Sequence, residues 1–359
     1  MTIKRRDFGH IVSAGAAIAL SGASSSSIAS TSSTQRAKSM TKLIKPRGLK
    51  TGDAVALITP GGFVDDALID KSVRNLESFG LKPRLLPNIK AARGNFAGTV
   101  AQRVDDLHSA FQNAEIKALW AIRGGSGGAQ ILPSLDYAMI RRNPKIVIGY
   151  SDITALLIAL NRYCGLVTFH GPVASSTFSD YSVNHLRAVL FEATTQHVMR
   201  TATDNDAKAA DSPEYLARAL RPGVCEGALA GGNLSVLASL IGTPFAPSLT
   251  DALLFIEEIG EAPYRIDRML TQIAQSYGSK PPSGAMLGVM RKCDPAKDEA
   301  SLSLAETLLD FAAINTVPVV AGYSFGHISH QMTLPIGIRA RLDSAAQSLT
   351  LLEAATIRN

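Results

Sequence analysis

Three side chains suited to nucleophilic catalysis follow separate apolar runs of this sequence: Ser151, Glu257 and His327. A serine hydroxyl can attack a carbonyl carbon when a histidine takes its proton and a carboxylate orients the histidine ring. The order serine, acid, histidine along the chain also occurs in other serine hydrolases. Together the three residues predict a catalytic triad assembled from distant segments.

Ser151 lies where an expected strand turns into an expected helix. Residues 145–148 form a short, mostly β-branched run typical of an inner strand, and the apolar residues from 153 to 160 have helical spacing. Gly149 permits a tight turn between them. A serine at the start of that helix would lie beside free backbone N–H groups, which can hold an oxyanion.

A second interpretation of this turn is that Ser151 or Asp152 caps the helix, because both residue types are preferred at N-caps. The G-x-S-x-G pattern of common serine hydrolases is also absent, since Ile153 occupies the position of its second glycine. The turn alone therefore leaves capping and catalysis both open.

Glu257 and His327 also have structural alternatives. Glu257 ends an apolar run and is followed by Glu258, and paired acids are typical of a solvated edge. A single histidine such as His327 is commonly a structural residue. A metal site at His327 and His330 would lack an H-E-x-x-H helix and a neighbouring acid, so no metal is predicted.

A glycine loop at residues 124–128 follows the apolar run 118–122. The backbone amides of this loop, which includes Gly124, Gly125 and Ser126, suit a phosphate, a substrate carboxylate or an oxyanion. The loop lacks the lysine of a P-loop and the G-x-G-x-x-G spacing, so no nucleotide cofactor is predicted. A glycine turn needed only for close packing is the structural alternative.

The first part of the chain alternates between strands and helices. Strands are expected at residues 54–58, 118–122 and 145–148, with helices at 65–79 and 101–111. This alternation predicts an α/β fold with a mostly parallel sheet covered by helices. Ligands of such sheets bind beyond the carboxyl ends of the strands, so the loops at Thr59, Gly124 and Ser151 are expected to converge there.

The chain divides into several segments by composition. We expect the nucleophile-bearing α/β domain at residues 46–178, a polar connection at 179–222, and a second domain at 223–356 that carries Glu257 and His327. The second domain is expected to contain strands at 253–256 and 317–320 and helices at 265–277 and 302–313.

The N-terminus has the order of a signal peptide. Basic residues at Lys4-Arg5-Arg6 precede a short apolar stretch and small residues before Ala29, which predicts twin-arginine export to the periplasm and cleavage near Ala29. The stretch is too short for a stable membrane span, and residues 30–45 are expected to form a disordered linker. The net charge of +6 falls partly in this N-terminus, and no basic run with interleaved aromatics argues for nucleic acid.

These residues belong to an ordered set of segments that resembles the serine LD-carboxypeptidases, a family that includes microcin-immunity peptidases. The resemblance extends from about Pro46 to the C-terminus. The segments are residues 58–62, 96–99, 123–125, 149–154, 168–172, 231–234, Glu257 with 263–270, and 325–327.

The resemblance implies that Ser151 is the nucleophile, Glu257 the triad acid and His327 the general base. It places the oxyanion donors at the backbone amide of Asp152 and in the glycine loop, where Gly125 is the first choice. It also implies a smaller mixed α/β C-terminal domain, a site in the cleft between the two domains, no cofactor, and a homodimer.

The implied reaction is metal-independent removal of a C-terminal D-amino acid, D-alanine, from a murein tetrapeptide. Two departures from the family lie beside the expected pocket: Ser126 replaces a usual aromatic, and Ala230 replaces a tryptophan of some members. They keep open a second amide substrate, a peptide-antibiotic conjugate in an immunity role. A protein that binds wall fragments without turnover is the alternative outside enzymes.

Overall fold

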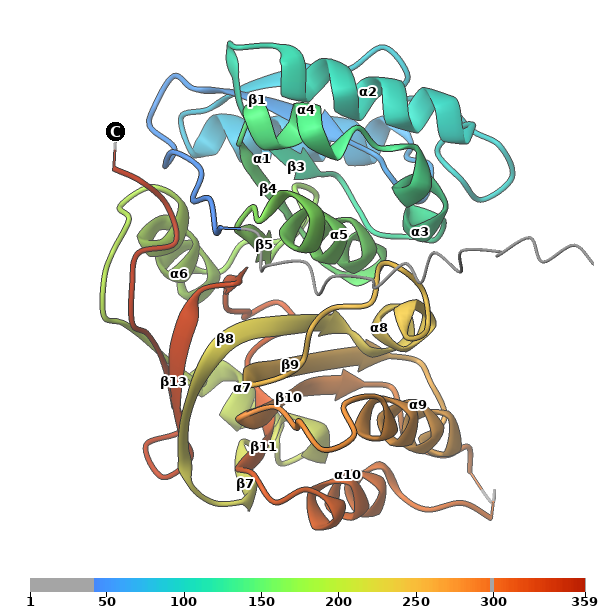
Figure 1. Ribbon diagram of the computed structural model, residues 1–359, viewed down its shortest axis with the longest axis vertical. Helices are drawn as coiled ribbons and strands as arrows, with labels where there is room; N and C mark the ends of the chain where they lie inside the picture. The colour runs from blue at the N-terminus through green and yellow to red at the C-terminus, as the bar shows by residue number, and fades with distance from the viewer. Residues whose placement is uncertain (1–41, 298–299, 359) are drawn as a thin grey trace, which may run out of the picture. The chain divides into compact units, whose positions relative to one another are not determined.

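The computed structural model describes residues 42–297 and 300–358, which form two β-sheets with flanking helices (Figure 1). The predicted signal peptide and most of the predicted linker lie outside the described residues. The mixed α/β class expected from the sequence is confirmed. No helix within the described ranges is long and apolar enough to cross a membrane.

The first sheet has six strands in the order β12-β5-β4-β3-β1-β2, and β1 to β5 are parallel. Its inner strands are continuous apolar runs, as expected when helices cover both faces of a parallel sheet. The strands are β1 (Ala54–Ile58), β2 (Lys82–Leu85), β3 (Ile116–Ala121), β4 (Ile146–Gly149), β5 (Thr168–His170) and β12 (Leu334–Ile336).

The helices of this first region begin at capping residues that the sequence supplies. The Asp65 side chain accepts from the Leu68 amide, and Thr99 forms a capping box with Gln102. The helices are α1 (Asp66–Ser78), α2 (Val100–Gln112), α3 (Gly128–Ile131), α4 (Tyr137–Arg142), α5 (Thr154–Cys164) and α6 (Asp180–Leu190).

The second sheet has eight strands in the order β6-β14-β13-β8-β9-β10-β11-β7, with β8 to β11 parallel at its centre. Figure 1 shows α8, α9 and α10 next to one another beside these central strands. The elements are β6 (His197–Arg200), α7 (Thr203–Lys208), β7 (Arg218–Arg221), β8 (Val224–Asn233), α8 (Leu234–Leu240), β9 (Ala252–Ile259), α9 (Pro263–Ser276), β10 (Gly284–Arg291), α10 (Leu304–Ile314), β11 (Val319–Tyr323), β13 (Arg339–Asp343) and β14 (Ser348–Leu351).

Two features of the sheets differ from the expected organisation. The segment 179–222, expected to be a connection, contains α6, α7 and both edge strands of the second sheet, β6 and β7. Edge strands need little buried apolar surface, and in these two strands only Met199 is buried, which explains the weak pattern. The chain also returns at β12 to pair antiparallel with β5, so residues 334–336 complete the first sheet.

Candidate active site

Ser151 lies at a strained turn between β4 and α5. Its φ angle is +63°, in the left-handed region that a residue with a side chain adopts only when its surroundings enforce it. A single 3₁₀ turn, Ser151–Ile153, joins the turn to α5. Neither Ser151 nor Asp152 caps a helix with its side chain, so the capping interpretation of this turn is wrong.

The glycine loop packs directly on this turn. A Cβ atom on Gly124 would lie 2.8 Å from Ser151 Cβ and 2.9 Å from Ser151 Oγ, so only glycine fits there. Gly125 has φ +117°, and a Cβ on it would lie 2.5 Å from the Gly62 amide nitrogen. The three strand-end loops therefore meet at one edge of the first sheet, as the sequence predicts.

The carboxylate of Asp152 joins the glycine loop to the turn. Asp152 Oδ2 accepts from the Gly128 amide at 2.8 Å, and the side chain is buried. Burial raises the pKa of Asp152, and the Gly128 amide and the charge of Arg103 offset part of that rise. Ser126, by contrast, is exposed, and its hydroxyl accepts from Asn95 Nδ2 at 2.6 Å.

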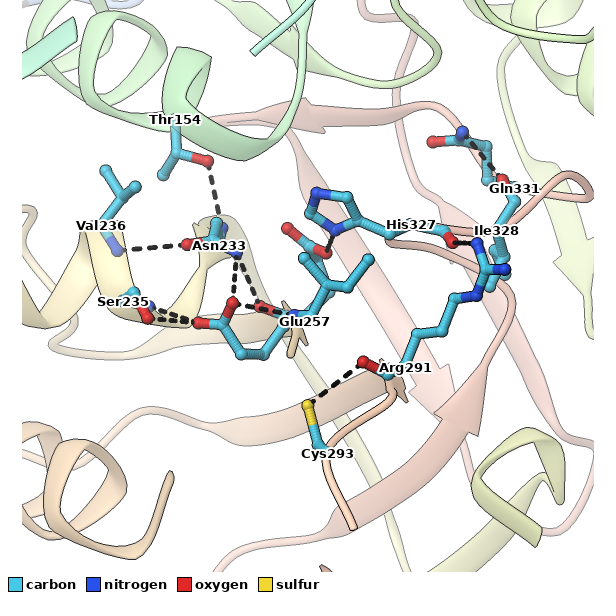
Figure 2. A network of polar contacts seen from close by, with 12 residues as sticks. Thr154, Asn233, Ser235, Val236, Glu257, Arg291, Cys293, His327, Ile328 and Gln331 are labelled. Carbon is cyan, nitrogen blue, oxygen red and sulfur yellow. Dashed lines mark hydrogen bonds and ion pairs between the residues drawn. The ribbon is translucent and has the colours of Figure 1, made fainter. Parts of the chain in front are cut away.

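Glu257 and His327 form a hydrogen-bonded pair. The Glu257 side chain is fully buried, that of His327 is 15% exposed, and His327 Nδ1 lies 2.7 Å from Glu257 Oε2. Figure 2 shows the contact between them. Burial opposes ionisation of Glu257, but the hydrogen bond from His327 and the nearby histidine charges bring its pKa below the usual value. The solvated-edge interpretation is wrong for both acids, because Glu258 is buried as well.

The structure brings Glu257 and His327 together and places them near the serine turn. The His327 ring centroid lies 4.9 Å from that of Tyr150, the residue before Ser151. Across residues 42–297 and 300–358, the Ser151 hydroxyl makes no hydrogen bond, to His327 or to any other group. Catalytic hydrogen bonds are commonly long before substrate binds, so this geometry is compatible with a triad.

Asn233, which sequence reasoning left without a role, joins the two halves of the site. The Asn233 backbone N–H donates to Thr154 Oγ1 in α5 at 3.0 Å (Figure 2). The side-chain Nδ2 of Asn233 donates to Glu258 Oε1 at 3.1 Å. Glu258 also accepts from Ser235 and from the Ile259 amide. Asn233 is also the N-cap of α8. An asparagine just before an apolar run is a sequence pattern that could have predicted this capping role.

Known proteins match both halves of this arrangement. Residues 55–171, which contain Ser151, match the LD-carboxypeptidase N-terminal domain. Residues 226–342, which contain Glu257 and His327, match the LD-carboxypeptidase C-terminal domain. The chain belongs to the LD-carboxypeptidase family.

Individual relatives align over 72% to 86% of this chain. It is 36% identical to a probable murein peptide carboxypeptidase of Bacillus subtilis, over 86% of this chain and 94% of the relative. It is similar to the structure of a muramoyltetrapeptide carboxypeptidase from Oxalobacter formigenes, with a TM-score of 0.70 and 30% identity over 83% of this chain and 97% of that one. It is also 26% identical to the microcin C7 self-immunity protein MccF of Escherichia coli, over 72% and 80% of the two chains.

Family membership supports a carboxypeptidase activity. Within residues 42–297 and 300–358, no group of three or more histidine, cysteine or acidic residues is arranged so that it could hold a metal ion. His330 pairs with Asp204 at 3.6 Å.

Proposed function

We propose that this chain is a serine LD-carboxypeptidase that removes a C-terminal D-amino acid, D-alanine, from a murein tetrapeptide without a metal ion. The buried Glu257–His327 hydrogen bond beside the strained serine turn carries the proposal. A fully buried carboxylate whose pKa is lowered can hold one imidazole tautomer and stabilise the imidazolium that forms during catalysis.

In the proposed reaction, His327 Nε2 takes the Ser151 proton while Ser151 Oγ attacks the carbonyl carbon of the L,D-amide. The oxyanion accepts hydrogen bonds from the Asp152 amide and from the glycine loop at Gly124 and Gly125. His327 then protonates the leaving amine, which releases D-alanine and an acyl-enzyme. A water molecule, deprotonated by His327, hydrolyses the ester and restores Ser151.

The test is to incubate the purified protein with murein tetrapeptide and to identify the products by mass spectrometry. Equimolar tripeptide and D-alanine are expected, undiminished by a metal chelator. Ser151→Ala should abolish the reaction, because the attacking oxygen is lost. Full activity in that variant, or loss of wild-type activity on metal removal, would overturn the assignment.

A second candidate function is hydrolysis of an amide in a peptide-antibiotic conjugate. The similarity to a microcin C7 self-immunity protein favours it, as do Ser126 and Ala230 at the positions where the sequence departs from the family. Comparing kcat/KM for a murein tetrapeptide and for aminoacyl sulfamoyl nucleosides separates the two substrates. A wall-fragment-binding protein would release no product and would leave Ser151 unlabelled by a serine-reactive phosphonate.

We also propose export by the twin-arginine route to the periplasm, cleavage near Ala29, and a homodimer. The Lys4-Arg5-Arg6 run supports the export route. Arg5→Lys with Arg6→Lys should retain the precursor in the cytoplasm, as fractionation and N-terminal sequencing would detect. Light scattering should give twice the chain mass, and a monomer mass would contradict the dimer.

A further inference from the structure

His170 is a buried histidine that the proposed mechanism does not use. It ends β5, its side chain has no exposed surface, and neither ring nitrogen has a hydrogen-bond partner among the described residues. Burial lowers the pKa of His170 to about 4, so the ring is neutral near pH 7 and carries one N–H donor. A buried donor of this kind ordinarily has a partner.

The position of His170 links it to both halves of the site. His170 pairs with Gly149 in the β4–β5 register, and Gly149 is the residue before Tyr150. Its ring centroid lies 6.0 Å from Tyr150, and the Tyr150 ring in turn lies 4.9 Å from His327. His170 therefore belongs to the sheet that carries Ser151, yet it lies close to the pair formed by the second sheet.

Two phenylalanines place His170 against the acid and the base. The His170 ring packs edge-to-face on Phe255 at 5.3 Å and on Phe325 at 6.4 Å. Phe255 precedes Glu257 by two residues in β9, and residues two apart in a strand project from the same face. Phe325 likewise precedes His327 by two residues.

Glu257 has an unpartnered atom that complements the unpartnered donor of His170. Glu257 Oε2 accepts from His327, whereas Glu257 Oε1 is buried and has no partner among the described residues. The negative charge of Glu257 raises the pKa of His170 and so offsets part of the larger effect of burial, as expected for neighbouring groups in a region of low dielectric constant. The buried His170 ring N–H donor and the buried Glu257 Oε1 acceptor, each without a partner among the described residues, therefore lie in the same region of the core.

We propose that His170 is a positioning residue for the Glu257–His327 pair, its neutral ring N–H holding Glu257 Oε1 through one bridging water molecule. A carboxylate held at both oxygens has one orientation, so Oε2 stays directed at His327 Nδ1. This inference rests on the proposed triad, because it assigns His170 a part in orienting that triad's acid.

The first test is nuclear magnetic resonance of the ¹⁵N-histidine-labelled protein without substrate. The His170 ring N–H should show a cross-peak to a bound water, and Glu257→Gln should move the His170 ¹⁵N shifts. In His170→Phe, the low-field proton of the Glu257–His327 hydrogen bond should broaden or shift. Unchanged resonances in Glu257→Gln would overturn the proposal even if His170→Phe fails to fold.

The second test is a double-mutant cycle with murein tetrapeptide. His170→Phe should lower kcat about 10- to 100-fold with KM within about twofold, and His170→Gln, which keeps an N–H donor, should recover most of that loss. In a Glu257→Ala background, His170→Phe should change kcat less than about twofold. Equal losses in both backgrounds would show a packing role and contradict the proposal.

A matched control is His185→Phe, which makes the same change at another buried histidine, in α6, where His185 Nδ1 bonds His197 Nε2 at 2.9 Å. It should leave kcat and the His327 proton unchanged. Failure of the proposed function is seen separately, as a Ser151→Ala variant that still forms tripeptide, and it leaves the resonance test intact.

Discussion

The backbone fixes the geometry of one half of the site, and buried side chains fix that of the other. At the end of β4, the geometry is set by the backbone: Ser151 is held at a positive φ, and Gly124 approaches it so closely that no Cβ fits. At the end of β9, it is set by buried side chains, because Glu257 bonds His327 and Glu258 bonds four donors. We therefore expect activity or stability to fall in the first half when atoms are added. In the second half we expect it to fall when a charge or a hydrogen-bond acceptor is removed.

The largest effect should come from removing charge in the second half. Glu257→Gln keeps the size of the side chain but removes the negative charge that stabilises the His327 imidazolium. We expect kcat for murein tetrapeptide to fall about 10⁴-fold, as for the acid-to-amide change in a Ser-His-Asp triad, with KM little changed. Steady-state kinetics measure this, and a loss below about tenfold would contradict the role given to Glu257.

The next effect should come from adding one methyl group in the first half. Gly124→Ala would place a Cβ 2.8 Å from Ser151 Cβ, so the turn or the loop must shift. A displacement of the nucleophile approaching about 1 Å should lower kcat about 10²-fold. Gly242→Ala is the control, since its Cβ would meet nothing within 4 Å despite φ of +87°, and it should keep full activity.

Glu258 tests whether the second half also depends on acceptors. Its Oε1 accepts from Asn233 Nδ2 and the Ile259 amide, and its Oε2 accepts from the Ser235 amide and hydroxyl. Glu258→Gln turns one oxygen into an NH₂ group facing donors, which should cost about 2–4 kcal/mol of unfolding free energy. Urea unfolding measures the cost. Activity should fall less than tenfold at temperatures where the variant is folded, in contrast to Glu257→Gln.

Sequence reasoning reached the first half of the site more completely than the second. The turn at Ser151 and the helix after it depend on residues that are neighbours in the chain, so apolar spacing and a glycine were sufficient to predict them. Glu257 and Glu258 project to opposite faces of β9, and the partner that each face meets is up to 70 residues away. No local sequence pattern predicts which of the two acids forms a hydrogen bond with His327 and which forms one with Asn233.

The elements missed in the fold have the same cause. Strands β6 and β7 are short edge strands in which only Met199 is buried. Strand β12 joins the first sheet because the chain returns to it after β11 of the second sheet. Their pairing depends on distant partners and leaves little trace in composition. The apolar runs before Glu257 and His327 and the family resemblance both indicated these two residues, but neither gave a role to His170 or Glu258, whose surroundings only the structure describes.

The smallest effect should be a pH dependence of opposite sign in the two halves. Burial raises the pKa of Asp152 in the folded state, so ionised Asp152 costs stability as pH rises above its unfolded value near 4. Asp152→Asn keeps an oxygen for the Gly128 amide and removes that cost. Its melting temperature should therefore exceed that of the wild type at pH 7, with the difference vanishing below about pH 4.

Glu257 should show the opposite trend, because its folded pKa is lowered. Its ionised form stabilises the fold above the unfolded pKa of about 4.5, and that contribution disappears as pH falls through the lower folded pKa. Glu257→Gln should therefore melt below the wild type at pH 7 and approach it in acid. Melting curves of both variants from pH 3 to pH 8 measure the two slopes. If the difference in melting temperature between variant and wild type changed with pH in the same direction for Asp152→Asn and Glu257→Gln, the opposite pKa shifts given to the two carboxylates would be contradicted.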